Sequence, residues 1–428
     1  MMKERIAIVS GYRTPFLRAA TDFKDLDADD LAAFVLKQLM LLSGMATSSV
    51  DEVILGNVAQ PSKAANVSRV SALKAGFENH IPAYSVQRNC ASGMESVSTA
   101  INKILVGKAD TIVAGGTESM TNIPFLFSRK MKSFFENLMK AKTPLKKLGV
   151  LSSFKFHYLA PVIGLVDGLT DPICGQIMGI TAENLAKEFS ITRLDQDKYA
   201  LHSHQKALAA QESGFFQQET IAVPAGFESL VSTDNGPRSD QTLERLQKLK
   251  PYFDRRYGTV TVGNACPITD GAAAMILKRE SDAKRDHDSI LGYIRDYDYA
   301  GLEPSRMGLG PVYATAKLFK RTGITLADID AIEMNEAFAA QIIANLRAFE
   351  SESFSKHYLG LDKAIGEVNM DTFNIHGGAI ALGHPVGATG ARLLITLLHT
   401  LKKINKQRGL ATLCVGGGQG ASFIVEVD

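Results

Sequence analysis

The sequence predicts an α/β protein made of two similar halves, with a segment of different character between them. Strand-like and helix-like runs alternate from about residue 4 to 121 and again from about 284 to 428, as in a sheet covered by helices. Short segments also recur in the same order, with 50–55 resembling 329–334 and 109–116 resembling 410–417. This internal repeat is too long for a solenoid unit, so we interpret it as a duplicated domain.

In the first half, the apolar run at 6–10 predicts a strand and has neither the length nor the cleavage site of a secretory signal. Residues 82–89 predict a second strand. A helix is predicted from Cys90 onward, because apolar residues recur at helical spacing from Met94. Cys90 is therefore expected where a strand gives way to a helix.

The middle region, from about 121 to 256, breaks the alternating pattern. Its first part, 125–160, carries eight Lys or Arg residues against one acid, Glu136, interleaved with phenylalanine and leucine. Such a segment can lie on an anionic membrane surface or against a partner protein. It can equally be a pair of helices packed on their own domain with a solvated lysine face, and both interpretations stay open at this point.

The second half repeats the strand-to-helix arrangement of the first. Residues 373–375 lead through two glycines to 383–390, where a leucine-rich helix is expected to begin. His384 lies at this helix start, as Cys90 does in the other half. Two similar halves packed face to face would bring both helix starts to one shared site, so one half can supply a nucleophile and the other a base.

Composition excludes several classes of protein. The 428 residues carry a formal net charge of +2, which gives no reason to expect a nucleic-acid partner. The four cysteines are far apart and form neither a metal-binding spacing nor a disulfide framework, which favours a reducing compartment and predicts no metal. No stretch approaches the roughly 18 apolar residues of a membrane span. We therefore expect a cytoplasmic protein, with peripheral membrane contact through 125–160 as an open alternative.

Two side chains at the helix starts are candidates for catalysis. A thiol at a helix start lies near the positive end of the helix dipole, which favours the thiolate of Cys90. The alternative is a small buried cysteine that only packs, but the small neighbours of Cys90 leave its sulfur accessible. His384 lies in a glycine-rich loop, where an acid/base role is favoured over a structural one.

Two further residues follow predicted strands. Cys414 precedes the glycine-rich run 415–420, whose backbone N–H groups could stabilise an oxyanion. This run lacks the G-x-G-x-x-G spacing of a dinucleotide site. Asn335 could hold a water or a carbonyl group, or it could serve only as a helix N-cap.

Together, five motifs resemble the thiolase family, in the family's order and over nearly the whole chain. They are NCASG at 89–93, GGTESM at 115–120, NEAF at 335–338, GHPVGATG at 383–390 and CVGGGQG at 414–420. The resemblance implies a thiolase fold of two βαβαβαββ halves in α-β-α-β-α layers. It also implies a division into a first core half at 1–121 and 254–283, an inserted loop domain at 122–253 and a second core half at 284–428.

The resemblance also implies the catalytic roles. Cys90 would become acylated, His384 would activate its thiol, and Cys414 would exchange a proton with the α-carbon of the acetyl-CoA unit. One oxyanion hole would combine His384 with a water held by Asn335. The other would consist of the backbone N–H groups of Cys90 and Gly416. Coenzyme A is then a co-substrate, with no tightly bound cofactor and no metal.

For coenzyme A binding, the resemblance points to Met178 and Gly179, which match the family's Met-Gly pair, and to Cys266 and Phe338. Many thiolases carry a serine where this chain has Cys266. Because coenzyme A has an anionic phosphate end and a long pantetheine arm, we expect a cationic rim and a narrow apolar slot. His376 stands where many thiolases have a small or amide residue, and we expect it to pack in its loop rather than to take part in catalysis.

The stretch 125–160 resembles the insertion in the thiolase subunit of the trifunctional fatty-acid oxidation complex and its bacterial relatives. This implies a 3-ketoacyl-CoA thiolase of β-oxidation that acts on medium or long chains. It also implies a homodimer or dimer of dimers and a hydratase/dehydrogenase partner subunit. The alternatives are an acetoacetyl-CoA thiolase working in the condensing direction, a ketoacyl synthase with one cysteine and two histidines, and a noncatalytic lipid-carrier or scaffolding subunit.

Overall fold

The computed structural model describes residues 2, 4–226 and 229–428, and its two halves contain matching sheets. The first sheet has the order β1 (Ile6–Arg13), β10 (Thr269–Arg279), β5 (Thr111–Ser119), β3 (Glu52–Gly56) and β4 (Ala83–Val86), with β2 (Leu17–Arg18) beside β10. The second has the order β11 (Gly292–Gly301), β14 (Gln419–Glu426), β13 (Arg408–Val415) and β12 (Ala331–Met334).

Strand directions also match between the halves. The pairs β1 with β10 and β10 with β5 are antiparallel, as are β11 with β14 and β14 with β13. The pairs β3 with β5 and β12 with β13 are parallel, and a parallel bridge between Ile332 and Phe373 takes the place of the pairing between β3 and β4. The predicted duplication is therefore confirmed. The two sheets join where Ile6 of β1 pairs with Ile294 of β11.

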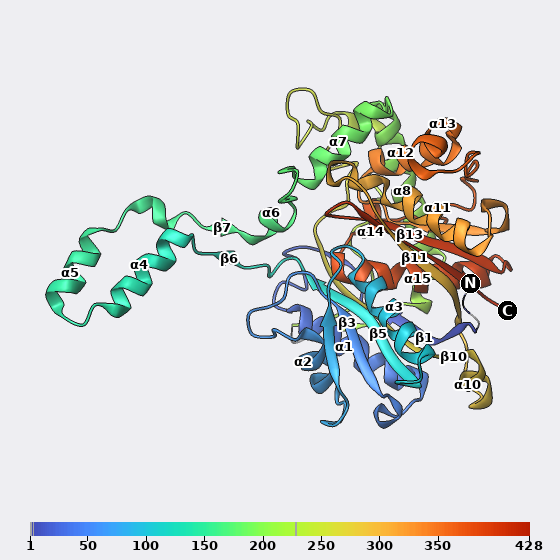
Figure 1. Ribbon diagram of the computed structural model, residues 1–428, viewed down its shortest axis with the longest axis horizontal. Helices are drawn as coiled ribbons and strands as arrows, with labels where there is room; N and C mark the ends of the chain where they lie inside the picture. Colours follow the sequence, from blue (N-terminus) through green and yellow to red (C-terminus); the bar gives the residue numbers. More distant parts are fainter. Residues whose placement is uncertain (1, 3, 227–228) are drawn as a thin grey trace.

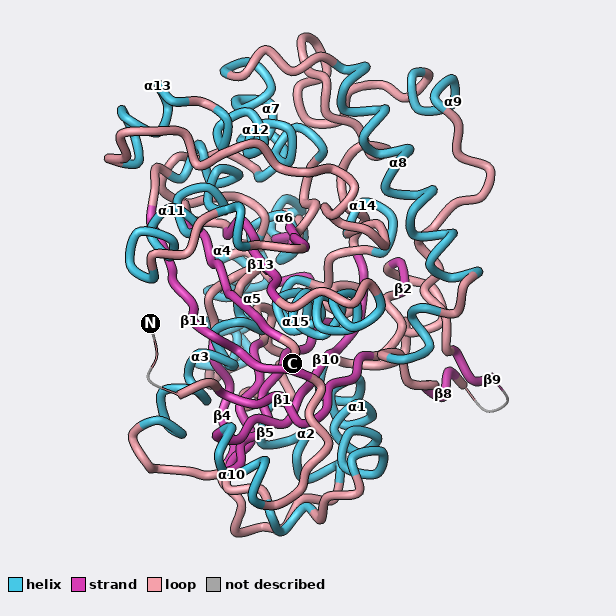
Figure 2. Tube along the Cα trace, turned by 90° about the vertical axis from the view of Figure 1, so that its right-hand side faces the viewer, coloured by secondary structure: helices cyan, strands magenta, loops and turns pink. Residues whose placement is uncertain are grey.

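Helices cover both sheets and separate them, in five layers (Figures 1 and 2). One outer layer holds α1 (Ala28–Ser43) and α2 (Val67–Ala75), which share a hydrophobic core with the first sheet. The central layer holds α3 (Ser92–Leu105) and α15 (Val386–Lys403), whose core includes strands of both sheets. The other outer core contains α7 (Met178–Glu188), α11 (Gly310–Thr322) and α12 (Ala339–Glu350). This is the predicted α-β-α-β-α arrangement.

Further elements accompany these layers, and α6 (Gly164–Gly168) follows the projecting segment described below. Others are α8 (Arg193–Glu212), α9 (Leu243–Gln247), α10 (Glu280–Arg285), α13 (Glu352–Phe354), α14 (Ala379–Leu382), β8 (Val223–Ala225) and β9 (Ser229–Val231). Of these, α14 matters most for function, because it ends two residues before His384.

Glycines allow the two central helices to approach closely at their N-terminal ends. A Cβ atom on Gly93 of α3 would lie 2.9 Å from the backbone oxygen of Gly387 in α15. A Cβ atom on Gly390 would lie 2.6 Å from the backbone nitrogen of Met94. Only glycine permits this backbone contact. The contact brings the helix starts that follow Cys90 and His384 together, as the sequence repeat predicts.

Part of the middle region forms an arm that projects away from the layered body, and we call residues 125–163 the arm (Figure 1). Its strands β6 (Phe125–Leu126) and β7 (Val162–Ile163) pair with each other, and between them lie α4 (Arg129–Lys140) and α5 (Pro144–Ser152). The alternative in which these helices pack on their own domain is therefore wrong. No helix among the described residues is long and apolar enough to cross a bilayer.

Candidate active site

Cys90 lies in a turn between β4 and α3 that contacts the other half of the molecule. Asn89 has a positive φ of 43°, a conformation that asparagine tolerates better than most residues. Its side-chain amide donates a hydrogen bond of 2.7 Å to the backbone oxygen of Gly416. The turn that presents the Cys90 sulfur is thus attached to the glycine-rich loop that follows Cys414.

The environment of Cys90 favours the protonated thiol in the free protein. Burial raises the pKa of the Cys90 thiol, and hydrogen bonds from the backbone N–H groups of Gly416 and of Cys90 itself oppose this shift only in part. The sequence-based expectation that the helix start favours a thiolate is therefore wrong for this state, because desolvation outweighs the nearby N–H groups. Cys90 needs a base before it can act as a nucleophile.

His384 is buried and held in one orientation by Thr389. Its Nδ1 lies 2.6 Å from Thr389 Oγ1, and that hydroxyl donates to the backbone oxygen of Pro385 at 3.1 Å. Because the hydroxyl proton is used there, Nδ1–H is the donor to Oγ1 and Nε2 carries the free lone pair. Burial, followed by the charge of Arg392, lowers the pKa of His384 to about 3. The imidazole is therefore neutral near pH 7 and can accept a proton at Nε2.

Two buried groups at the site have no hydrogen-bond partner among the described residues. One is Nε2 of His384, and the other is the side-chain amide of Asn335. Buried polar atoms are rarely left without a partner, so both are available to a water or a substrate. The alternative role of Asn335 as a helix N-cap is wrong, because Phe338 occupies that position in α12.

Asn335 and Cys414 lie at the same edge of the second sheet. Asn335 follows β12, and its backbone N–H donates to the oxygen of Thr412 in the neighbouring parallel strand β13. Burial, followed by the charge of a Cys90 thiolate, raises the pKa of Cys414 well above its usual value and that of Cys266 to about 12. Both thiols are therefore protonated at neutral pH, as the Cys90 thiol is.

A cavity of about 560 Å³ opens beside Cys90. Its wall includes Met178, Val386 and Gly416, and one side is formed by residues 164–173 at the base of the arm. The wall is largely apolar, as expected for a slot. The expected cationic rim is absent from the described lining, which instead contains Asp167 and Asp171. No sequence motif signals the segment 164–173, so sequence reasoning missed it.

The residues assigned to coenzyme A take different positions. Met178 lines the cavity. Gly179 lies beneath the ring of Phe253, where a Cβ atom would be only 2.2 Å from the ring. Phe338 is buried with its ring 6.0 Å from that of Phe253, and Cys266 donates a backbone hydrogen bond to the strand-like segment before Phe338. Gly179, Cys266 and Phe338 are thus absent from the described wall of this cavity.

His376 packs as expected from the sequence. Its ring stacks on that of Phe215 with a centroid separation of 3.5 Å. Burial, followed by the nearby lysines, lowers the pKa of His376 to about 4. This second histidine is occupied by packing, which disfavours the ketoacyl synthase alternative with its two catalytic histidines.

Comparisons with known proteins agree along the whole chain. The family model described as "Thiolase, N-terminal domain" matches residues 6–281, and the one described as "Thiolase, C-terminal domain" matches residues 288–427. A "3-ketoacyl-CoA thiolase" of Yersinia enterocolitica is 42% identical over 99% of this chain and 97% of that protein, and one of Yersinia pestis is 40% identical over the same shares.

Solved structures show the same similarity. The human mitochondrial 3-ketoacyl-CoA thiolase in complex with CoA superposes with a TM-score of 0.86 at 33% identity, covering 99% of this chain and 98% of that one. The acetyl-CoA acetyltransferase of Bacillus anthracis gives the same TM-score at 34% identity and the same coverage.

Proposed function

The chain belongs to the thiolase family, and we propose that it is a 3-ketoacyl-CoA thiolase, an acyltransferase of fatty-acid β-oxidation. It would cleave a 3-ketoacyl-CoA with coenzyme A into acetyl-CoA and a shortened acyl-CoA. The observation that supports this proposal is the contact between the helix starts that follow Cys90 and His384. Cys414 lies near the end of β13, two residues before Gly416, whose backbone oxygen accepts a hydrogen bond from the Asn89 amide. A complete set of reactive groups disfavours a noncatalytic subunit.

In the proposed cleavage, His384 Nε2 takes the proton of Cys90 as the sulfur attacks the 3-keto carbon. The bond between that carbon and the α-carbon then breaks, and the α-carbon takes a proton from Cys414. Acetyl-CoA leaves, and the acyl group stays on Cys90. A second coenzyme A gives its thiol proton to Cys414 and takes the acyl group, and Cys90 recovers its proton from His384.

The geometry favours a separate oxyanion site for each carbonyl group. The N–H groups of Gly416 and Cys90 lie next to the Cys90 sulfur, so they suit the oxygen of the carbon that becomes bonded to it. The unpartnered His384 Nε2 and Asn335 amide would then serve the thioester oxygen of the acetyl-CoA unit. Loss of one such donor costs roughly 2.7–4 kcal/mol in other acyl-transfer enzymes, so each site should contribute about as much as the Cys414 proton donor and less than the Cys90 nucleophile.

The first test is a thiolysis assay across 3-ketoacyl-CoA substrates of four to sixteen carbons. Because the cavity of about 560 Å³ beside Cys90 has a largely apolar wall, we expect activity to persist with medium and long chains. Preference for the four-carbon substrate with rapid loss beyond it would favour the acetoacetyl-CoA thiolase alternative. No turnover of any substrate, despite a folded protein, would contradict the thiolase proposal.

We further propose that the protein is cytoplasmic and that the arm contacts an anionic membrane surface. The described cysteines are all free, as suits a reducing compartment. The arm holds exposed apolar side chains beside its basic ones, including Met139, Leu145 and Phe156, which are 81%, 82% and 85% exposed. Apolar insertion combined with lysine contacts to headgroups binds helices to such surfaces.

Vesicle sedimentation tests the arm. The protein should bind vesicles containing anionic phospholipid and should be released by added salt, because lysine contacts to headgroups are screened. Glutamine at four exposed arm lysines should abolish binding and leave thiolysis of a short substrate intact, and the sites are Lys140, Lys142, Lys146 and Lys147. Four exposed lysines of the body give a charge-matched control that should still bind: Lys320, Lys356, Lys363 and Lys406.

Equal loss of binding in both lysine variants would mean that net charge, not the arm, drives association. Binding only to a hydratase/dehydrogenase subunit, and not to vesicles, would assign the arm to a protein partner instead. We also propose a homodimer or a dimer of dimers, which light scattering at several protein concentrations would measure.

A further inference from the structure

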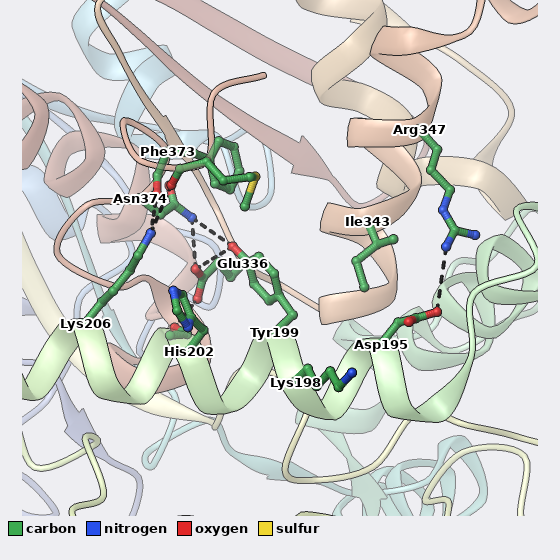
Figure 3. Close-up of a pocket in the computed structure, with 12 residues that line it drawn as sticks. Asp195, Lys198, Tyr199, His202, Lys206, Glu336, Ile343, Arg347, Phe373 and Asn374 are labelled. Atoms are coloured by element: carbon green, nitrogen blue, oxygen red, sulfur yellow. Dashed lines mark hydrogen bonds and ion pairs between the residues drawn. The ribbon is translucent and has the colours of Figure 1, made fainter. Parts of the chain in front are cut away.

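We infer that Glu336 is a positioning residue that holds Asn335 and the segment before His384 in place for the carbon–carbon cleavage step. This rests on the proposed thiolase function and extends it to a residue that touches neither substrate nor thiol. Glu336 is buried and is one of the residues that line a surface pocket of about 390 Å³ (Figure 3).

Four donors from three segments converge on the two oxygens of Glu336. Oε1 accepts from the Tyr199 hydroxyl at 2.8 Å and from the Asn374 amide at 2.9 Å, as Figure 3 shows. Oε2 accepts from the Ser203 hydroxyl at 2.6 Å and from the backbone N–H of Ile380 at 3.2 Å. Tyr199 and Ser203 belong to α8, so the carboxylate links this helix to the loops of the site.

Both unpartnered groups of the site lie next to these contacts in the chain. Asn335 directly precedes Glu336. Ile380 is in α14, a single turn that ends at Leu382 and is followed by Gly383 and His384. A Cβ atom on Gly378, just before α14, would lie 2.3 Å from the Glu336 carboxyl carbon, so the two segments are in direct contact. One carboxylate therefore connects the strand end that carries Asn335 to the segment that leads to His384.

The other oxyanion site is held independently of Glu336. Its N–H groups belong to Gly416 and Cys90, and the Asn89 amide bonded to the Gly416 oxygen joins the two segments. No described contact of Glu336 involves either segment. A change at Glu336 should therefore disturb one oxyanion site and spare the other.

Glutamine cannot replace Glu336 without losing a hydrogen bond. Its NH₂ group would take the place of one oxygen and would face either the Asn374 amide or the Ile380 N–H. A backbone N–H cannot become an acceptor. The Asn374 amide cannot turn over either, because its Oδ1 accepts from the backbone N–H of Met334 at 2.8 Å. Glu336→Gln thus preserves the size of the side chain and removes one of its hydrogen bonds to the site.

The experiment compares two reactions of the purified full-length protein. Thioester exchange, measured as incorporation of labelled coenzyme A into a saturated acyl-CoA, needs only acylation and deacylation of Cys90. Thiolysis of a 3-ketoacyl-CoA needs cleavage as well. We expect Glu336→Gln to lower kcat for thiolysis about 10- to 100-fold, as small misplacements of catalytic groups do. The exchange rate should fall less than about 3-fold, because the Cys90 and Gly416 site is retained and the His384 ring keeps its own hydrogen bond to Thr389.

Glu219→Gln is the matched control. Glu219 is another buried carboxylate, which accepts from Arg13 at 2.6 Å and from the Thr396 hydroxyl at 3.2 Å, and it contacts neither site loop. This variant should lower the melting temperature without changing the ratio of the two rates. If Glu336→Gln fails to fold, the double variant Tyr199→Phe, Ser203→Ala keeps the charge, removes the contact to α8, and should change the same ratio in the same direction.

Equal losses in exchange and thiolysis, or no loss in thiolysis, would overturn the positioning role. Those outcomes differ from failure of the proposed function itself. If the unmodified protein carries out exchange but does not cleave any 3-ketoacyl-CoA, the thiolase proposal fails before Glu336 is tested.

Discussion

Cys90→Ala should abolish thiolysis, with kcat lower by at least about 10⁴-fold, since loss of a nucleophile removes the covalent route entirely. The neutral His384 would remain, but it would have no thiol to activate. Mass spectrometry after mixing with an acyl-CoA should show the mass of the acyl group on the unmodified protein and none on the variant. The adduct should map to the peptide that contains residue 90.

Cys174→Ser is the control for this change, because Cys174 is also a free cysteine and is absent from the described cavity wall. It should keep both turnover and the acyl adduct. Full turnover by Cys90→Ala, or an adduct on another cysteine, would show that the nucleophile has been wrongly assigned.

The local patterns of the chain were enough to predict both helix starts. Apolar spacing after Cys90 and after His384 indicates buried helices, and in the structure α3 and α15 form the central layer. Paired glycines at 93 and 390 provide the close contact, although nothing in the sequence shows that they face each other. The division of the chain into two core halves and an inserted loop domain stays a prediction.

Properties that depend on distant packing could not be predicted. The protonated state of Cys90 results from burial by segments remote in sequence, which outweighs the local effect of the helix start. The cavity wall at 164–173 has neither a charge pattern nor a motif to mark it. Composition did reveal the amphipathic character of the arm, but its projection from the body depends on contacts that composition does not encode.

Cys414 is expected to matter more for cleavage of the carbon–carbon bond than for acylation of Cys90. Burial holds the pKa of Cys414 well above its usual value, so it is a protonated thiol that can supply a proton to the departing α-carbon. Cys414→Ala removes this proton donor and leaves Cys90 and His384 in place. Thiolysis should fall about 10²- to 10⁴-fold, the usual contribution of a general acid. A steady-state assay would measure thiolysis, and incorporation of labelled coenzyme A into a saturated acyl-CoA would measure thioester exchange separately.

Exchange should be affected much less than thiolysis in Cys414→Ala, because acylation of Cys90 by a saturated acyl-CoA breaks no bond to an α-carbon. In exchange, His384 can carry the thiol proton between Cys90 and coenzyme A, so Cys414 is not needed. Cys414→Ser is the informative companion variant, since its hydroxyl fits the site but is a far weaker acid than a thiol. It should resemble alanine in thiolysis if acidity is what the reaction requires. Near-normal thiolysis in Cys414→Ala would contradict the proton-donor role and would leave His384 as the only acid/base group at the site.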